Sequence, residues 1–287
     1  MAERTVPASV KLLAGMWAAV LLVAVALTGT WLVRSPGVNA HVAVAGPSES
    51  ELRMVAQTKV LFGHNSVGMD ILDGLATVYA DASVAAPAVA DVTGGAVAPD
   101  GESAAFRHAY IGVNGDPTSK LAAFTEVMDS AAGKDVDVAL MKLCYADITA
   151  ATDVEAVFDG YVSTMAEVEA AHPDVRFLYT TVPLTADRSW KSKIKAVLGR
   201  DDEMGPADNV ARERYNAMIR DQYAATGRLV DIAAVEAAGT GERSKDGSTY
   251  YVLNENLTRD RGHLNEAGAA AVAVEVVKVV AGRGAVG

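Results

Sequence analysis

Apolar runs of strand length alternate with segments of helical periodicity, and this alternation limits the fold more than any other feature of the sequence. Strands that are separated by helices are joined by right-handed crossovers into a parallel sheet with helices on both faces. We therefore expect an α/β/α sandwich around a mainly parallel, five-stranded sheet. The strand-like runs are residues 59–62, 88–92, 136–143, 175–182 and 228–231. The helical patterns are residues 67–80, 118–131, 153–170, 207–225 and 266–280.

The composition excludes several classes of protein. The 287 residues are 51% apolar and 21% charged, which supports a large buried core. The net charge of −11, without a cluster of Lys and Arg, argues against a nucleic-acid surface. The single cysteine, Cys144, cannot form an intramolecular disulfide, and the five histidines lack metal-ligand spacing. We expect no metal site.

An uncharged segment near the N-terminus, residues 12–33, predicts export of the rest of the chain. As a helix it would span about 33 Å, enough for a hydrocarbon core of about 30 Å. Arg4 and Lys11 precede it and Arg34 follows, which favours a membrane anchor with the C-terminal domain outside the cytoplasm. A cleaved signal peptide is the alternative, because residues 38–40 resemble a cleavage site. The expected division is an anchor over residues 1–34, a linker over residues 35–46 and one domain over residues 47–287.

A polar turn joins the first strand-like run to the first long helical pattern. Gly63, His64 and Asn65 lead into Ser66 at the expected helix start. Ser66 either caps the helix, as serine often does, or acts as a nucleophile whose oxyanion the helix N-terminus stabilises. Functional groups of parallel sheets collect beyond the carboxyl ends of the strands, which is the expected position of Ser66.

A candidate base for Ser66 lies before the last helical pattern. Asp260 stands three residues before His263. Its carboxylate could accept the ring N–H, fix the tautomer and leave the other nitrogen to accept the serine proton. A turn residue is the alternative for Asp260, and a capping or surface histidine is the alternative for His263.

These motifs together resemble the SGNH/GDSL hydrolase superfamily. The turn ending in Ser66, Gly112 after the second strand, and the Asp260–His263 pair follow the family's order over residues 59–282. The resemblance implies a flavodoxin-like fold and serine-dependent hydrolysis or transfer of an ester-linked acyl group, without a cofactor. It implies that Ser66 is the nucleophile, His263 the base and Asp260 the acid that orients it. The backbone N–H groups of Ser66 and Gly112 would form the oxyanion hole.

The chain departs from the family's third motif, Gly-x-Asn-Asp, whose asparagine donates to the oxyanion. Residues 141–147, after the third strand, contain no asparagine. Asn114 could supply an amide N–H instead, and Lys142 could supply a cation. The alternatives are a turn former for Asn114 and a charge pair with Asp147 for Lys142. We expect His64, Asn65 and Lys142 to line the substrate pocket.

The sequence therefore predicts an exported, membrane-tethered serine hydrolase that cleaves or transfers an ester-linked acyl group on a cell-surface carbohydrate. The expected partners are an ester or glycan substrate and the membrane, but not a nucleic acid. Two alternatives stay open. One is a catalytically inactive glycan-binding or scaffold domain on the same fold, and the other is a cytosol-facing domain on a reversed anchor.

Overall fold

The computed structural model describes residues 46–96, 106–187 and 205–282. These residues belong to the larger of two compact units, Ala43–Gly287. The expected anchor over residues 1–34 lies outside the described ranges, as does the expected linker except for its last residue. Within the described ranges, no helix is long and apolar enough to cross a membrane.

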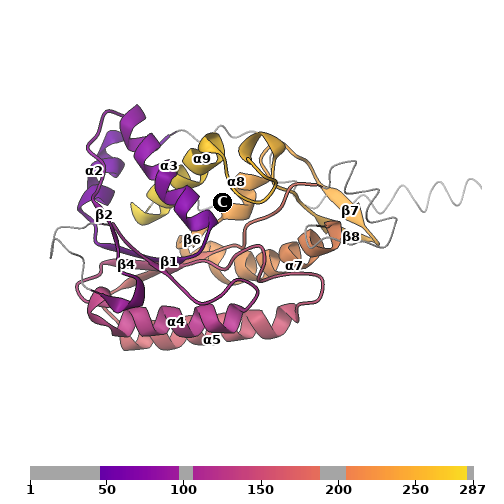
Figure 1. Ribbon diagram of the computed structural model, residues 1–287, viewed down its shortest axis with the longest axis horizontal. Helices are drawn as coiled ribbons and strands as arrows, with labels where there is room; N and C mark the ends of the chain where they lie inside the picture. The colour runs from indigo at the N-terminus through magenta and orange to yellow at the C-terminus, as the bar shows by residue number, and fades with distance from the viewer. Residues whose placement is uncertain (1–45, 97–105, 188–204, 283–287) are drawn as a thin grey trace, which may run out of the picture. The chain divides into compact units, whose positions relative to one another are not determined.

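Six parallel strands form the central sheet, which is seen in Figure 1. Their order is β2-β3-β1-β4-β5-β6, and every neighbouring pair is parallel. Without the short edge strand β2, this is the doubly wound order of flavodoxin-like folds. The structure confirms the predicted fold class, with one more strand than the five expected. The strands are Val60–His64 (β1), Val89–Asp91 (β2), Phe106–Tyr110 (β3), Val138–Met141 (β4), Arg176–Thr180 (β5) and Leu229–Val230 (β6).

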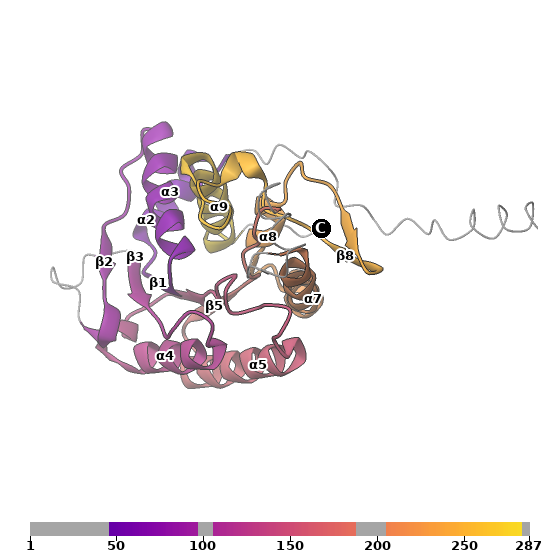
Figure 2. The same ribbon diagram turned by 45° about the vertical axis from the view of Figure 1, so that its right-hand side comes forward.

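Helices cover both faces of the sheet, and Figure 2 shows α3 and α9 side by side on one of them. The five long helices that periodicity predicts all form, with ends within two residues of the prediction. One face carries α2 (Glu49–Gln57), α3 (Val67–Asp81), α8 (Ile232–Glu236) and α9 (Glu266–Val280). The other face carries α4 (Pro117–Asp129), α5 (Val154–Ala171) and α7 (Pro206–Tyr223).

Alternate residues of each strand enter two separate cores. In β1, Val60 and Phe62 pack under α3 and α9, whereas Leu61 packs against the α4 and α5 layer. Because both faces of the strand are buried, its sequence is a continuous apolar run. The same alternation continues past the strand ends and decides which polar side chains are buried at the candidate site.

A small hairpin occupies part of residues 239–257, a Gly-rich and polar stretch that lies outside the predicted strands and helices. Strands β7 (Arg243–Lys245) and β8 (Ser248–Tyr250) pair antiparallel, and the hairpin projects beside α7 in Figure 1. Its turn residues, Asp246 and Gly247, both have positive φ angles of 50° and 83°. An Asp-Gly pair with this geometry is typical of a tight two-residue hairpin turn.

Candidate active site

The order of the strands reverses between β1 and β4. The chain passes from β1 to β3 on one side and then returns across β1 to β4 on the other. In doubly wound sheets, ligands bind outside the carboxyl ends of the strands at such a point. The turn ending in Ser66 follows β1, and the loop of residues 142–147 follows β4. The topology alone therefore places the predicted nucleophile at the sheet's expected binding edge.

Ser66 is the N-cap of α3, but its side chain makes no capping hydrogen bond. Its backbone has a φ of 33° and a ψ of −92°, a conformation that residues other than glycine rarely adopt. Strained backbone of this kind is held mainly at functional sites, where the surrounding structure fixes it. The hydroxyl is therefore not committed to the helix end, and the first N–H groups of α3 lie beside it.

Asp260 and His263 form a hydrogen-bonded pair. His263 Nδ1 lies 2.7 Å from Asp260 Oδ2, and the backbone N–H of His263 donates to Asp260 Oδ1 over 2.7 Å. Partial burial raises the pKa of Asp260, but the N–H groups of His263 and Gly262 and the His263 ring outweigh it and hold this pKa below its ordinary value. Asp260 is a carboxylate at neutral pH, so Nδ1 carries the proton that faces it.

Asp70 connects α3 to the turn that carries His263. It lies four residues after Ser66, on the same side of the helix. Its Oδ2 accepts from the backbone N–H of Leu264 over 3.1 Å, and its Oδ1 accepts from Arg259 over 2.8 Å. The structure thus joins two segments 194 residues apart next to the predicted nucleophile and base. In the described ranges, no hydrogen bond joins the Ser66 hydroxyl to the His263 ring, and catalytic hydrogen bonds are often long before substrate binds.

Tyr145, in the loop after β4, also contacts the His263 ring. The two rings meet edge to face, with centroids 5.9 Å apart. Arg212 on α7 holds this loop, because its Nε donates to the backbone carbonyls of Tyr145 and Ile148 over 2.9 and 3.1 Å. No role for Tyr145 or Arg212 was predicted from the sequence. The signal for Tyr145 was its place just beyond a strand at the carboxyl edge of the sheet.

Gly112 and Asn114, the other predicted oxyanion-hole residues, lie in the loop after β3. Gly112 has a φ of 51°, and a Cβ there would lie 2.5 Å from the backbone nitrogen of Lys120, so only glycine fits. Asn65 donates from Nδ2 to the carbonyl of Ile111 and so ties this loop to the turn of Ser66. The structure therefore brings this loop to the same edge as Ser66.

His64 and Lys142 do not line an open pocket, and this prediction is wrong. Both side chains are fully buried, because they continue the alternation of β1 and β4 onto the face covered by α3. His64 Nε2 lies 3.1 Å from His108 Nδ1, and burial lowers the pKa of His64 to about 3. Lys142 donates to Cys144 Sγ over 3.4 Å and does not pair with Asp147. Asn65, which is half-buried, stays a candidate pocket residue.

Glu236, at the end of α8, is a buried acid that titrates above its ordinary range. Its Oε2 accepts from the N–H of Leu184 over 2.6 Å, whereas its Oε1 has no hydrogen-bond partner among the described residues. Burial raises its pKa to about 8, although Lys142 and Arg212 oppose the shift.

Glu236→Gln is expected to stabilise the protein increasingly as the pH rises from about 4.5 to about 8. In that window the unfolded carboxyl ionises while the folded one stays protonated, so the wild type loses stability that glutamine keeps. The gain should reach a few kcal/mol, at about 1.4 kcal/mol per pKa unit. Urea unfolding of both proteins at pH 5 and pH 8 measures it, with the exposed Glu255→Gln as control. A difference in stability that does not change with pH would contradict the expectation.

Within the described residues, no group of three or more His, Cys, Asp or Glu side chains could hold a metal ion. No protein-family model and no curated protein matches the chain. Its fold is similar to several solved structures.

One such structure is a carbohydrate esterase family 3 protein from Talaromyces cellulolyticus, with 14% identity over 78% of this chain and 96% of that chain and a TM-score of 0.45. A second is the periplasmic domain of the lipopolysaccharide acetyltransferase of Salmonella ser. Paratyphi A, with 10% identity over 82% and 90% and a TM-score of 0.44. A third is the lipase/acylhydrolase from Enterococcus faecalis, with 12% identity over 79% and 96% and a TM-score of 0.44. Structures this distant do not indicate the activity of this chain, which must be argued from its own residues.

Proposed function

We propose that this protein is a serine hydrolase of SGNH type, which cleaves an ester-linked acyl group or transfers it to another hydroxyl. One observation supports this most directly. Asp70 links the first turn of α3, which begins after a strained and uncapped Ser66, to the turn that carries the Asp260–His263 pair. An alcohol, an imidazole and a carboxylate at one sheet edge are the components of a serine triad.

In the proposed reaction, Ser66 Oγ attacks the ester carbonyl carbon while His263 Nε2 accepts the hydroxyl proton. The N–H groups of Ser66 and Gly112, with the amide of Asn114, stabilise the negative charge that develops on the carbonyl oxygen. His263 then gives its proton to the alcohol oxygen as the C–O bond breaks, which leaves an acyl group on Ser66. Water or an acceptor hydroxyl attacks this acyl group with His263 again as base, and Ser66 is regenerated.

The proposal extends to an exported, membrane-tethered enzyme that acts on acyl groups of a cell-surface carbohydrate. The support for export and tethering is the uncharged stretch of residues 12–33, which is long enough to cross a bilayer. A domain held outside the cytoplasm would meet carbohydrate esters directly.

Labelling of the full chain with a fluorophosphonate tests the hydrolase proposal. The reagent phosphonylates a serine hydroxyl that is activated by a neighbouring base, so the wild type should label and Ser66→Ala should not. Ser83→Ala is the matched control, because Ser83 lies after the other end of α3 and also has a positive φ, of 55°. Ser83→Ala should label like the wild type. A folded wild type without labelling would contradict the enzyme and favour a glycan-binding or scaffold domain.

A further inference from the structure

Lys120 and Asp147 form an ion pair in the interior. Lys120 comes from α4 and Asp147 from the loop after β4, their N···O distance is 2.6 Å, and both side chains are 0% exposed. Removing two charges from water is costly unless further hydrogen bonds satisfy them. The remaining contacts of the pair therefore indicate what it organises.

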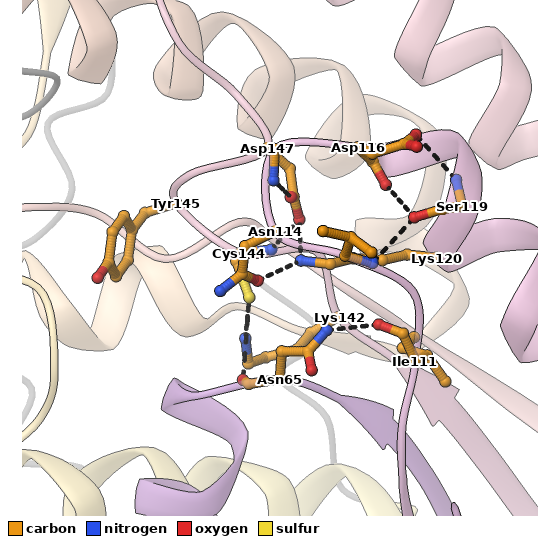
Figure 3. A network of polar contacts seen from close by, with 12 residues as sticks. Asn65, Ile111, Asn114, Asp116, Ser119, Lys120, Lys142, Cys144, Tyr145 and Asp147 are labelled. Carbon is orange, nitrogen blue, oxygen red and sulfur yellow. Dashed lines mark hydrogen bonds and ion pairs between the residues drawn. The ribbon is translucent and has the colours of Figure 1, made fainter. Parts of the chain in front are cut away.

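These contacts hold together the two loops at the active-site edge, as Figure 3 shows. Asp147 Oδ1 accepts from the N–H of Gly115 over 2.8 Å, and its Oδ2 accepts from the N–H of Cys144 over 2.6 Å. Lys120 Nζ donates to Asn114 Oδ1 over 2.8 Å. The loop after β3 and the loop after β4 are thus fixed to each other through one buried pair.

The contact with Lys120 also fixes which way the Asn114 amide faces. A lysine ammonium can only donate, so the oxygen of the amide must face Lys120 and the NH₂ group must face away. Asn114 is exposed, and its Nδ2 makes no hydrogen bond to a described residue. The adjoining Gly115 lies against the loop after β4, since a Cβ on it would be 4.0 Å from the carbonyl oxygen of Ala146.

We infer that Lys120 and Asp147 are positioning residues that present the Asn114 amide to the oxyanion. This inference rests on the proposed serine hydrolase. Ala146 stands directly before Asp147, where the third family motif would carry its asparagine. Asn114 supplies the amide donor from the neighbouring loop instead. An exposed asparagine would otherwise be free to rotate, and the buried pair fixes its orientation.

A double-mutant cycle on the full chain, with 4-nitrophenyl acetate as the probe ester, tests the inference. Asn114→Ala should lower kcat about 100-fold, the usual cost of one oxyanion donor, with little change in KM. Asn114→Asp is the matched variant, because it keeps an oxygen for Lys120 but removes the NH₂ donor, and it should lose as much. Lys120→Met combined with Asp147→Asn removes both charges and keeps one of the two side-chain oxygens that accept from the N–H groups of Gly115 and Cys144.

In this uncharged background nothing orients the Asn114 amide, so adding Asn114→Ala should lower kcat by less than about threefold. If the pair only stabilises the fold, Asn114→Ala should still lower kcat about 100-fold in this background. That result would overturn this inference but not the proposed hydrolase. If the double variant does not fold, Lys120→Met alone takes its place in the same cycle, with the fold checked by circular dichroism, because methionine cannot donate to Asn114 Oδ1. A wild type without hydrolysis that depends on Ser66 would overturn the proposed function, and this inference with it.

Discussion

His263→Ala is expected to lower kcat/KM for a 4-nitrophenyl ester by at least about 10³-fold while the protein stays folded. The imidazole is the group that accepts the Ser66 proton, and the structure holds it on Asp260 Oδ2 at 2.7 Å with Tyr145 at its edge. His263 lies in a turn outside the helices and strands, and its side chain is 27% exposed, so the fold should tolerate its loss. Ser66 and His263 act as a unit, so Ser66→Ala added to His263→Ala should cost almost nothing more.

His172 supplies the matched control for this prediction. It pairs with Asp129 over 3.0 Å, and so has the same chemistry as the Asp260–His263 pair. His172 lies at the C-terminal end of α5. Because crossover helices run opposite to the strands, His172 stands at the amino ends of the strands, away from the candidate active site. His172→Ala should leave kcat/KM within about twofold of the wild type. Equal losses in both variants, or a small loss in His263→Ala, would contradict His263 as the base.

Local patterns predicted the five long helices well but missed one strand of the central sheet. The helix Glu266–Val280 agrees at both ends with its prediction, because apolar residues recur along it at helical spacing. Strand β3, Phe106–Tyr110, contains Arg107 and His108, which hide its apolar pattern. Distant groups compensate for their burial. Arg107 donates to the carbonyls of Ala132 and Lys134, and His108 contacts His64. A window of sequence contains none of these partners.

The same limit explains which parts of the candidate site were predictable. Ser66 and the Asp260–His263 pair belong to short motifs, so sequence could propose them. The pairing of Lys142 with Asp147 looked reasonable because the two residues are close in the chain. The fold instead turns Lys142 to the α3 side of the sheet and gives Asp147 to Lys120, 27 residues away. Side-chain partners across different elements depend on the register of the sheet, which periodicity does not specify.

Arg212→Met is expected to lower the free energy of unfolding by about 3 to 5 kcal/mol. Arg212 is almost completely buried, and methionine can fill its volume but cannot donate. Besides the two carbonyls that Nε contacts, Nη1 donates to Thr185 Oγ1 and to Asn209 Oδ1, each over 2.8 Å. The substitution therefore leaves several buried acceptors without their donor, and each such loss costs about 1 to 3 kcal/mol before the loops adjust.

Arg214→Met, two residues further along α7, is the control for Arg212→Met. Its side chain is 61% exposed and pairs with Glu155 on the surface, so its loss should cost less than about 1 kcal/mol. Urea unfolding followed by circular dichroism compares the two variants on one helix. Equal midpoints would mean that the buried guanidinium does not stabilise the loops after β4 and β5. A large difference would mean that the buried cation from α7 stabilises the loop that carries Tyr145 to His263.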